Sequence, residues 1–243
     1  MLRLCAFDLG NTLVNDSLLF HGAVRDISEW LVSRGAVQNP EEFRKVYDEI
    51  NRQTFLPFIS HTYGELMFFE KAFSWLGTNT VSAEEALLQY RRFLLDRTHL
   101  SPVLIDGLNY LRSRGLRLCV ISNERTVRVT DFLKKTGLDP MFDGVFVSEE
   151  VGVEKPDERI FRLALDSFSL TGEEALMFGD NEIADGGCRS LGMFFVLVTE
   201  YKNRHWVWEG GSSHPPDYVM DRISRESLQK FFSWRENHDC PKR

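Results

Sequence analysis

The chain has 243 residues, of which 43% are hydrophobic and 27% are charged, and its formal net charge is -7. This composition is ordinary for a globular protein and excludes a disordered or fibrous chain. The acidic balance, without a dense run of Lys or Arg, argues against a nucleic-acid partner, because nucleic acids are bound through basic surfaces. No apolar stretch approaches the ~18 residues that suggest a membrane span, so we expect no membrane partner.

Four cysteines occur, and no two of them form a close CxxC pair. Cys5 and Cys119 lie inside apolar runs that are typical of strands, so we expect reduced and buried thiols. Residues 1–7 lead directly into a polar turn and lack the layout of a signal peptide. These features predict a cytoplasmic location.

The first predicted element is a buried strand at residues 2–7, which stops at the polar loop that begins with Asp8. The pattern is then helical from about residue 16 to residue 99. Breaks near residues 35–40, 56–61 and 77–81 divide this stretch into segments. We expect an all-helical insert with helices at residues 18–33, 41–52, 63–76 and 83–97.

After the insert, short apolar runs alternate with helical patterns. This alternation predicts a doubly wound parallel α/β sheet, and uninterrupted apolar strands fit a sheet that helices cover on both faces. The predicted domains are therefore an α/β core at residues 1–15 and 100–243 and a helical domain at residues 16–99. The expected strands are residues 116–121, 145–147, 175–178, 194–198 and an edge strand at 216–220; the expected helices are residues 103–113, 126–135, 157–168, 182–191 and 224–234.

Polar residues follow several of the predicted strands. In open α/β sheets, ligands bind at the carboxyl ends of the strands. We therefore expect these residues to share one crevice that contains three carboxylates, a lysine, two hydroxyls and free backbone N–H groups. The candidates are Asp8, Gly10, Asn11 and Thr12 after the first strand, Ser122 and Asn123 after the second, Lys155 after the third, and Asp180 and Asp185 after the fourth.

Phosphoryl transfer requires such a set of groups, because it depends on positioning and on electrostatic stabilisation of phosphoryl oxygens. Three carboxylates would repel a phosphate unless a hard cation lay between them, and Mg²⁺ prefers carboxylates together with water and substrate oxygens. The hydroxyls and Lys155 would then hold the phosphoryl oxygens. Asp8 is the best candidate nucleophile, since Gly10 permits close approach of the backbone.

Four motifs occur in order along the chain, and together they resemble those of the haloacid dehalogenase-like (HAD) hydrolase superfamily, in its phosphatase branch. The resemblance implies a Rossmann-like core, and the helical insert after the first motif resembles the helical cap of that superfamily. The motifs are Phe7-Asp8-Leu9-Gly10-Asn11-Thr12-Leu13, Val120-Ile121-Ser122-Asn123, Lys155-Pro156, and Gly179-Asp180-Asn181 through Asp185-Gly186.

The resemblance also implies a role for each matching residue. Asp8 is expected to be the nucleophile that carries an aspartyl-phosphate, and Lys155 to neutralise charge during catalysis. The expected Mg²⁺ ligands are Asp8, the backbone carbonyl of Gly10, Asp180 and Asp185, and the expected phosphate-binding residues are Asn11, Thr12, Ser122, Asn123 and Lys155.

Gly10 is a departure from the pattern that the resemblance implies. Most phosphatases of the superfamily have a second aspartate two residues after the nucleophile, which acts as general acid and base. Such a group typically contributes about 10²–10⁴-fold in rate. We therefore expect a good leaving group, an acid from elsewhere, for which His21 and His61 are candidates, or weak activity.

The residues of the chain are compatible with three functions. The leading one is Mg²⁺-dependent hydrolysis of a small phosphorylated metabolite. The second is displacement of halide from carbon by Asp8, as in 2-haloacid dehalogenases, which Gly10 permits but which the acidic residues disfavour. The third is a non-catalytic phosphate-binding protein on the same fold. The sequence leaves open the substrate, the choice between monomer and homodimer, and the role of the loop that contains Trp206 and Trp208.

Overall fold

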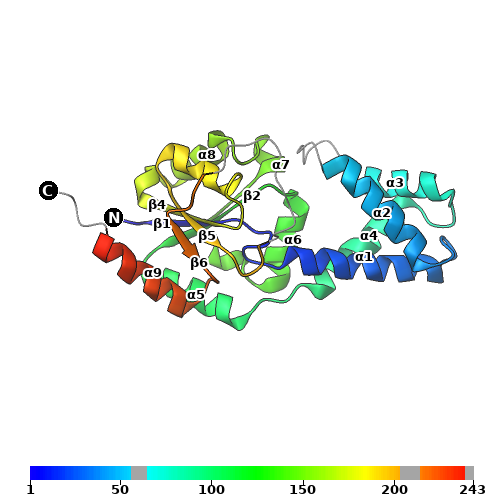
Figure 1. Cartoon of the computed structure of the whole chain (residues 1–243), viewed down its shortest axis with the longest axis horizontal. Coiled ribbons are helices and arrows are strands. Elements are labelled where there is room, and N and C mark those ends of the chain that lie inside the picture. The colour runs from blue at the N-terminus through cyan, green and yellow to red at the C-terminus, as the bar shows by residue number, and fades with distance from the viewer. Residues whose placement is uncertain (56–64, 203–213, 239–243) are drawn as a thin grey trace. The chain divides into compact units, whose positions relative to one another are not determined.

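The computed structural model of the chain describes residues 1–55, 65–202 and 214–238 (Figure 1). Two compact units are distinguished by their internal contacts: Met1–Asp16 with His99–Arg243, and Ser17–Thr98. The first unit contains the sheet, and the second contains only helices among its described residues. The divisions fall after Asp16 and before His99, each one residue from the boundary that we expected.

The first unit is built around a six-stranded sheet in which every neighbouring pair is parallel. The strand order is β3-β2-β1-β4-β5-β6, so that β1 lies near the centre with β2 on one side and β4 on the other. This arrangement confirms the predicted α/β class with a parallel sheet. The strands are β1 (Leu4–Phe7), β2 (Arg117–Ser122), β3 (Gly144–Val147), β4 (Ala175–Gly179), β5 (Phe194–Val198) and β6 (Tyr218–Met220).

Helices cover both faces of the sheet, as the apolar strands predicted (Figure 1). On one face, α8 (Glu158–Phe168) buries residues such as Phe161 in a hydrophobic cluster with β1, β2 and β4. On the other face, α5 (Pro102–Ser113) packs beside α9 (Arg225–His238), whose Phe231 ring lies 6.5 Å from that of Phe178 on β4. The fully buried β1 therefore lies in a dry core that fixes the position of the residue following it.

Local sequence explains where the core helices begin and end. Ser101 caps α5 by accepting the N–H of Val103, and Pro102 occupies the first turn, where its missing N–H is not needed. The helix α6 (Thr126–Thr136) ends at Gly137, which adopts a left-handed conformation with φ of 69°. Three short elements were not expected from the pattern: η1 (Asp139–Met141), α7 (Ser148–Val151) and η2 (Gly172–Glu174).

The predicted helix at residues 182–191 differs from the observed structure. A 3-10 helix, η3 (Asp185–Leu191), begins three residues later. The side-chain oxygen of Asn181 accepts hydrogen bonds from the N–H groups of Ile183 and Ala184. The backbone carbonyl of Asn181 accepts those of Asp185 and Gly186. These bonds form a turn that competes with an α-helical start, as Asn side chains often do.

The second unit is held together by aromatic packing. The Phe69 ring lies 6.2 Å from that of Phe43 and 5.7 Å from that of Tyr90, and Phe69 is only 2% exposed. An ion pair joins Arg97 to Asp26 at 2.5 Å. The helices are α1 (Asp16–Ser33), whose first residue belongs to the first unit, α2 (Pro40–Phe55), α3 (Glu65–Leu76) and α4 (Ala83–Arg97).

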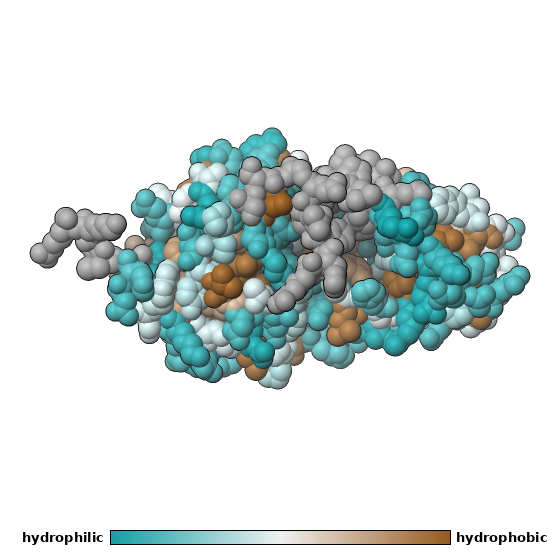
Figure 2. Space-filling model, in the orientation of Figure 1, coloured by the Kyte–Doolittle hydropathy of each residue, from teal (hydrophilic) through white to brown (hydrophobic). Residues whose placement is uncertain are grey.

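The surface is largely hydrophilic on the face that Figure 2 shows, with hydrophobic residues in small separate patches. Within the described ranges, the helices lack the combination of length and apolar composition that crossing a membrane requires. Three cysteines, Cys5, Cys119 and Cys188, are buried free thiols. Cys240, His61, Trp206 and Trp208 lie outside the described residues.

Candidate active site

The carboxyl ends of β1 and β4 bring two aspartates to one edge of the sheet. Phe7 pairs with Phe178, so that Asp8 and Asp180 follow neighbouring strands at nearly the same level. The N–H of Asp8 donates to the carbonyl of Phe178 at 2.9 Å, which extends the pairing by one residue. Because β1 is also the point from which the strand order runs in both directions, this edge is where open α/β sheets bind ligands.

Lys155 joins the site from the connection between β3 and β4. Its Nζ donates to Oδ1 of Asp8 and to Oδ1 of Asp185, each at 2.6 Å. Lys155 is 2% exposed and Asp185 is 1% exposed, so that this ammonium group and both of its partners are shielded from water. A buried charge of this kind is tolerated only when it is paired and hydrogen-bonded.

The side chain of Asn123 fixes the backbone of Lys155. Its Nδ2 donates to the Lys155 carbonyl at 2.8 Å, and its Oδ1 accepts the Lys155 N–H at 2.7 Å. We expected Asn123 to contact a phosphoryl group, but both polar atoms of its side chain are engaged here. The geometry therefore makes the Asn123 side chain a positioning group for Lys155, and leaves its backbone N–H for any contact with phosphate.

Asp185 is held by a close fit between η3 and the end of β4. The N–H of Asn181 donates to its Oδ2 at 3.0 Å, while Lys155 occupies its Oδ1. A Cβ atom placed on Gly179 would lie 2.2 Å from Cγ of Asp185, a separation that real Cβ atoms essentially never show. Only glycine at position 179 lets this carboxylate come so close to β4.

The loop after β1 turns tightly over the sheet edge. The carbonyl of Leu9 accepts the N–H groups of Leu13 at 2.9 Å and Val14 at 3.3 Å. Asn11 adopts φ of 54°, a left-handed conformation that Asn tolerates better than most residues. The hydroxyl of Thr12 donates to Oδ2 of Asp8 at 3.4 Å, a long hydrogen bond.

Asp16 is a buried carboxyl group that sequence reasoning assigned only to the start of the helical stretch. It is 8% exposed, and its Oδ1 accepts a hydrogen bond from Nη2 of Arg128 at 2.6 Å. A Cβ atom on Gly10 would lie 2.3 Å from Oδ2 of Asp16. Burial raises the pKa of Asp16; Arg128 opposes this and the charge of Asp8 adds to it, so that the net shift is upward.

The carboxylates at the sheet edge are close enough to share a cation. Asp8, Asp180 and Asp185 each offer an oxygen within 4.8 Å of the others. Burial, followed by the charges of Asp8 and Asp185, raises the pKa of Asp180 to about 8. Burial also raises the pKa of Asp185 to about 6, against the opposing effect of Lys155. Asp8 and Asp185 share the buried Lys155 ammonium group, and the oxygen-only donor set of the three carboxyl groups fits a hard divalent cation.

The pKa of Lys155 is raised as well, which keeps this side chain charged. Burial lowers the pKa of its ammonium group, but the charges of Asp185 and Asp8 and the hydrogen bonds to them outweigh burial and raise it. Lys155 is therefore a permanent positive charge at the sheet edge. It is suited to holding an anion there and unsuited to giving up a proton.

The structure brings together most of the residues that the sequence singled out. Lys155 contacts Asp8 and Asp185 directly, and Asp180 offers a carboxylate oxygen within 4.8 Å of theirs. Ser122 is a buried residue that ends β2. Besides Asp16 and Arg128, sequence reasoning missed Lys202, whose Nζ donates to the Asp180 carbonyl at 3.1 Å. Lys202 lies next to residues 203–213, which are not described, and no pattern in the sequence signals its role.

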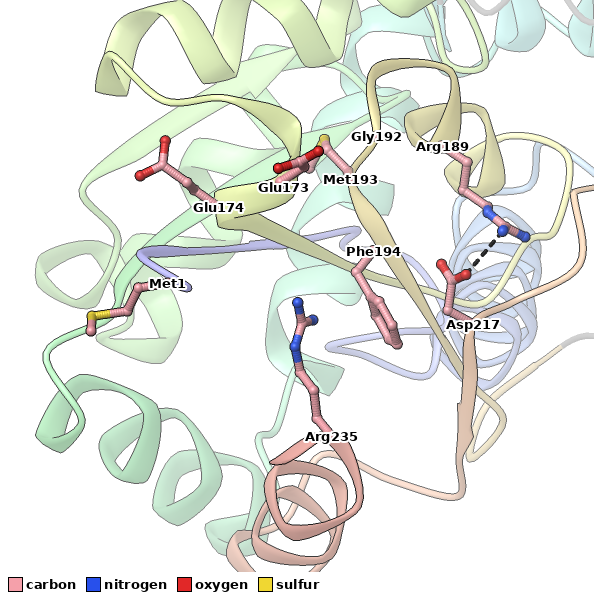
Figure 3. Close-up of a pocket in the computed structure, with 9 residues that line it drawn as sticks. All are labelled: Met1, Glu173, Glu174, Arg189, Gly192, Met193, Phe194, Asp217 and Arg235. Atoms are coloured by element: carbon pink, nitrogen blue, oxygen red, sulfur yellow. Dashed lines mark ion pairs between the residues drawn. The ribbon is translucent and has the colours of Figure 1, made fainter. Parts of the chain in front are cut away.

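A pocket of about 480 Å³ lies at the opposite edge of the sheet. Figure 3 shows the ion pair of Arg189 with Asp217 at 2.9 Å on one of its walls, and Phe194, at the amino end of β5, on another. Asp8, Lys155, Asp180 and Asp185 do not line this pocket, so it is separate from the candidate active site. Its lining residues are Met1, Glu173, Glu174, Arg189, Gly192, Met193, Phe194, Asp217 and Arg235.

A doubly wound sheet with a buried lysine and three carboxyl groups at its carboxyl edge defines an α/β enzyme centre. The family described as "haloacid dehalogenase-like hydrolase" matches residues 2–186, and the chain belongs to this family of hydrolases. It is thus an enzyme of the class that the motifs predicted.

Individual proteins are similar to the chain over most of its length. A glyceraldehyde 3-phosphate phosphatase from Methanothermobacter thermautotrophicus is 30% identical over 82% of this chain and 86% of its own. One from Pyrococcus abyssi is 27% identical, with 79% of each chain covered. Among solved structures, YfnB from Bacillus subtilis, described as bound to magnesium, has a TM-score of 0.71 at 21% identity and covers 96% of this chain and 99% of its own.

Proposed function

We propose that the protein is a Mg²⁺-dependent phosphohydrolase of small phosphomonoesters that uses Asp8 as its nucleophile. The observation that carries this proposal is the bridge from Nζ of Lys155 to Asp8 and Asp185, each at 2.6 Å, with the carboxylate of Asp180 close to both aspartates. It supports a site in which Asp8 acts as nucleophile, Lys155 supplies a fixed positive charge and the three carboxylates bind a cation. Phosphoryl transfer needs little more from a protein than this.

The carboxylates of Asp8, Asp180 and Asp185 would hold the metal ion. When bound, Mg²⁺ supplies positive charge that offsets both the carboxylates and the phosphoryl oxygens, which would otherwise repel each other. The raised pKa values of Asp180 and Asp185 support this assignment, because they arise from burial and, after burial, from the negative charge of neighbouring carboxylates, and a bound cation would offset both.

The chain's own residues would divide the remaining work. A carboxylate oxygen of Asp8 attacks phosphorus, the bond from phosphorus to the ester oxygen breaks, and that oxygen leaves as an alcohol after taking a proton. Water then attacks phosphorus of the aspartyl-phosphate, and the bond to Asp8 breaks to release phosphate. Lys155 neutralises charge on the transferring group, and the hydroxyls of Thr12 and Ser122 and the backbone N–H groups of Asn11 and Asn123 hold its oxygens.

A small phosphorylated metabolite is the proposed substrate. Two relatives that match about four fifths of this chain are named glyceraldehyde 3-phosphate phosphatases, and glyceraldehyde 3-phosphate is a three-carbon phosphomonoester. At about 30% identity or below, such relatives support the reaction type and the size class of the substrate. The proposal therefore extends to small phosphomonoesters as a class.

Hydrolysis of a 2-haloacid by Asp8 is the second function that the sequence left open. Release of halide needs neither a metal nor a proton donor, so Gly10 is compatible with it. The substrate would, however, bring its own carboxylate to an edge that already holds Asp8, Asp180 and Asp185 within 4.8 Å. Like charges at that separation are costly away from water, and we favour a phosphoryl substrate with a metal.

The test is a panel of phosphorylated metabolites with measurement of free phosphate in Mg²⁺ and in excess chelator. We expect turnover in Mg²⁺ only, and none above background in Asp8→Asn. Asp166→Asn, an exposed aspartate on α8, is the matched control and should keep wild-type rates. Chloride release from 2-chloropropionate in chelator would favour the dehalogenase. Tight phosphate binding without turnover would favour a binding protein.

A further inference from the structure

We propose that Asp16 is a catalytic residue, the general acid and base of the reaction, and that its carboxyl group acts from the space in front of Gly10. This inference rests on the proposed phosphohydrolase function. It starts from the place of Gly10, two residues after the proposed nucleophile Asp8. Gly10 has no side chain with which to move a proton to or from a substrate.

The space that a side chain at position 10 would fill is already occupied by the Asp16 carboxyl group. An added Cβ atom on Gly10 would lie 2.3 Å from Oδ2 of Asp16, 3.2 Å from its Cγ and 3.9 Å from its Cβ. The approach thus comes through the carboxyl oxygen and not through the backbone of the helix. A carboxyl group is therefore present in front of position 10, delivered from six residues further along the chain.

The loop between the two residues explains how Asp16 returns to Gly10. The Leu9 carbonyl accepts the N–H of Val14 at 3.3 Å, Gly10 forms a β-bridge with Val14, and the N–H of Asp16 donates to the Val14 carbonyl at 3.0 Å. These contacts fold the chain back on itself directly after the nucleophile. Asp16 and Gly10 belong to the same compact unit, so that their contact lies within the core.

Arg128 orients the Asp16 carboxyl group. Nη2 of Arg128 donates to Oδ1 at 2.6 Å, while Oδ2 is the oxygen on the side of Gly10. Arg128 also pairs with Glu124, which precedes α6, and the Arg128 and Asp16 side chains are 15% and 12% exposed. One carboxyl oxygen is thus anchored, and the other lies in front of Gly10.

The proton balance of the two steps closes with this residue. In the first step, protonated Asp16 gives its proton to the ester oxygen as the bond from phosphorus to that oxygen breaks, and Asp16 becomes a carboxylate. In the second step, Asp16 takes a proton from the water that attacks the phosphorus of phosphorylated Asp8. The Asp8 carboxylate leaves, and both side chains return to their starting states. The net reaction converts one ester and one water into one alcohol and one phosphate.

The test exploits the fact that a proton donor matters most for poor leaving groups. We would measure kcat/KM for phenyl phosphate, 4-nitrophenyl phosphate and 2,4-dinitrophenyl phosphate, since this constant reports the steps up to loss of the first alcohol. Asp16→Asn should lose about 100-fold or more on phenyl phosphate and less than about 10-fold on the dinitro ester. A loss of equal size on all three esters would overturn the assignment, because it would indicate a merely structural role.

A second variant tests the same claim by geometry and covers the case in which Asp16→Asn folds poorly. Gly10→Asp should be inactive, because its side chain collides with the Asp16 carboxyl group. Combining it with Asp16→Ala removes both atoms within 3.2 Å and returns a carboxyl group to the same space. The double variant should hydrolyse phenyl phosphate at least about 10-fold faster than Asp16→Ala alone. Equal rates in these two variants would contradict the proposal.

The outcomes separate this inference from the function on which it rests. Wild-type protein that releases no phosphate from any ester or metabolite with Mg²⁺ present would end the phosphohydrolase proposal, and the role of Asp16 with it. Wild-type turnover that Asp8→Asn abolishes, together with an unchanged leaving-group dependence in Asp16→Asn, would end the role of Asp16 alone. Asp166→Asn again serves as the matched control and should retain the wild-type dependence.

Discussion

Lys155 donates a 2.6 Å hydrogen bond from Nζ to Oδ1 of Asp8, although 147 residues separate them in the sequence. The same ammonium group holds Asp185 at the same distance. One buried cation thus fixes the carboxyl group that follows β1 relative to the one in η3. Every chemical role proposed for this sheet edge depends on that convergence, and the effects of several substitutions follow from it.

Replacing Lys155 with Met should impair both activity and stability. The variant keeps the length of the side chain but leaves Asp8 and Asp185 buried without their cation. Breaking a buried ion pair from one side typically costs about 3–5 kcal/mol, and we expect a loss of that order in metal-free protein, measured by urea unfolding. We expect kcat/KM to fall about 10³-fold or more.

The matched control for this substitution is Lys134→Met, at an exposed position in the last turn of α6. It should change the free energy of unfolding by less than about 0.5 kcal/mol and leave turnover intact. A Lys155→Met protein with normal stability and normal kcat/KM would show that the bridge has neither role.

Replacing Asp180 with Asn should stabilise the metal-free protein at neutral pH while abolishing its response to Mg²⁺. An unfolded Asp has a pKa of about 3.9, and the pKa of Asp180 is raised to about 8 in the fold. Between these values the folded state holds more protons than the unfolded state, so the stability of metal-free protein falls as pH rises from about 4 to about 8. Asn removes this loss, and we expect a gain of about 1–3 kcal/mol at pH 7.

Thermal unfolding at pH 5 and pH 8, with and without Mg²⁺, checks this prediction. The gain corresponds to a rise in Tm of roughly 3–10 °C for a chain of this size. The difference between variant and wild type should be larger at pH 8 than at pH 5, and Mg²⁺ should raise the Tm of wild type only. An Asp180→Asn protein that is less stable at pH 8, or that Mg²⁺ still stabilises, would count against the cation site.

Gly179→Ala should disturb the site through packing alone. The added Cβ atom would lie 2.2 Å from Cγ of Asp185, which is held on both sides by Lys155 and the Asn181 N–H. Overpacking of this kind typically costs about 1–3 kcal/mol, and displacement of Asp185 should lower kcat/KM as well.

Gly137→Ala provides the comparison for that substitution. Gly137 ends α6 at φ of 69° with no atom within 4 Å of an added Cβ, so its replacement reports backbone strain without collision. We expect Gly137→Ala to cost about 1 kcal/mol and to leave turnover unchanged. Equal effects of the two substitutions on kcat/KM would argue against the close fit at Gly179.

The sequence was sufficient to predict the α/β class and the approximate location of its main strands, because buried parallel strands are continuous apolar runs that end at polar residues. β5, for example, occupies residues 194–198 as expected. The start of η3 was missed because its determinant is a side-chain turn: Asn181 accepts two backbone N–H groups, which a helical pattern of apolar residues does not reveal.

The candidate site shows the same division between local and long-range information. Asp8 and Asp180 were identified from motifs that lie at strand ends, and Lys155 from a motif in the connection that follows β3. The contact of Asp16 with Gly10, and the ion pair that Arg128 makes across 112 residues, arise from tertiary folding and leave no periodic signal. For Asn123, the sequence predicted participation in the site but could not show that its side chain would be used to hold the Lys155 backbone.

Detection of the phosphorylated intermediate tests the central claim most directly. Wild-type protein would be mixed with 4-nitrophenyl phosphate and Mg²⁺, quenched in acid within milliseconds, and digested for mass spectrometry of the peptide that contains Asp8. The account predicts a phosphoryl group on Asp8 that is absent in chelator and in Asp8→Asn. Turnover in wild type with no phosphoryl group on Asp8, or with one on another residue, would contradict it.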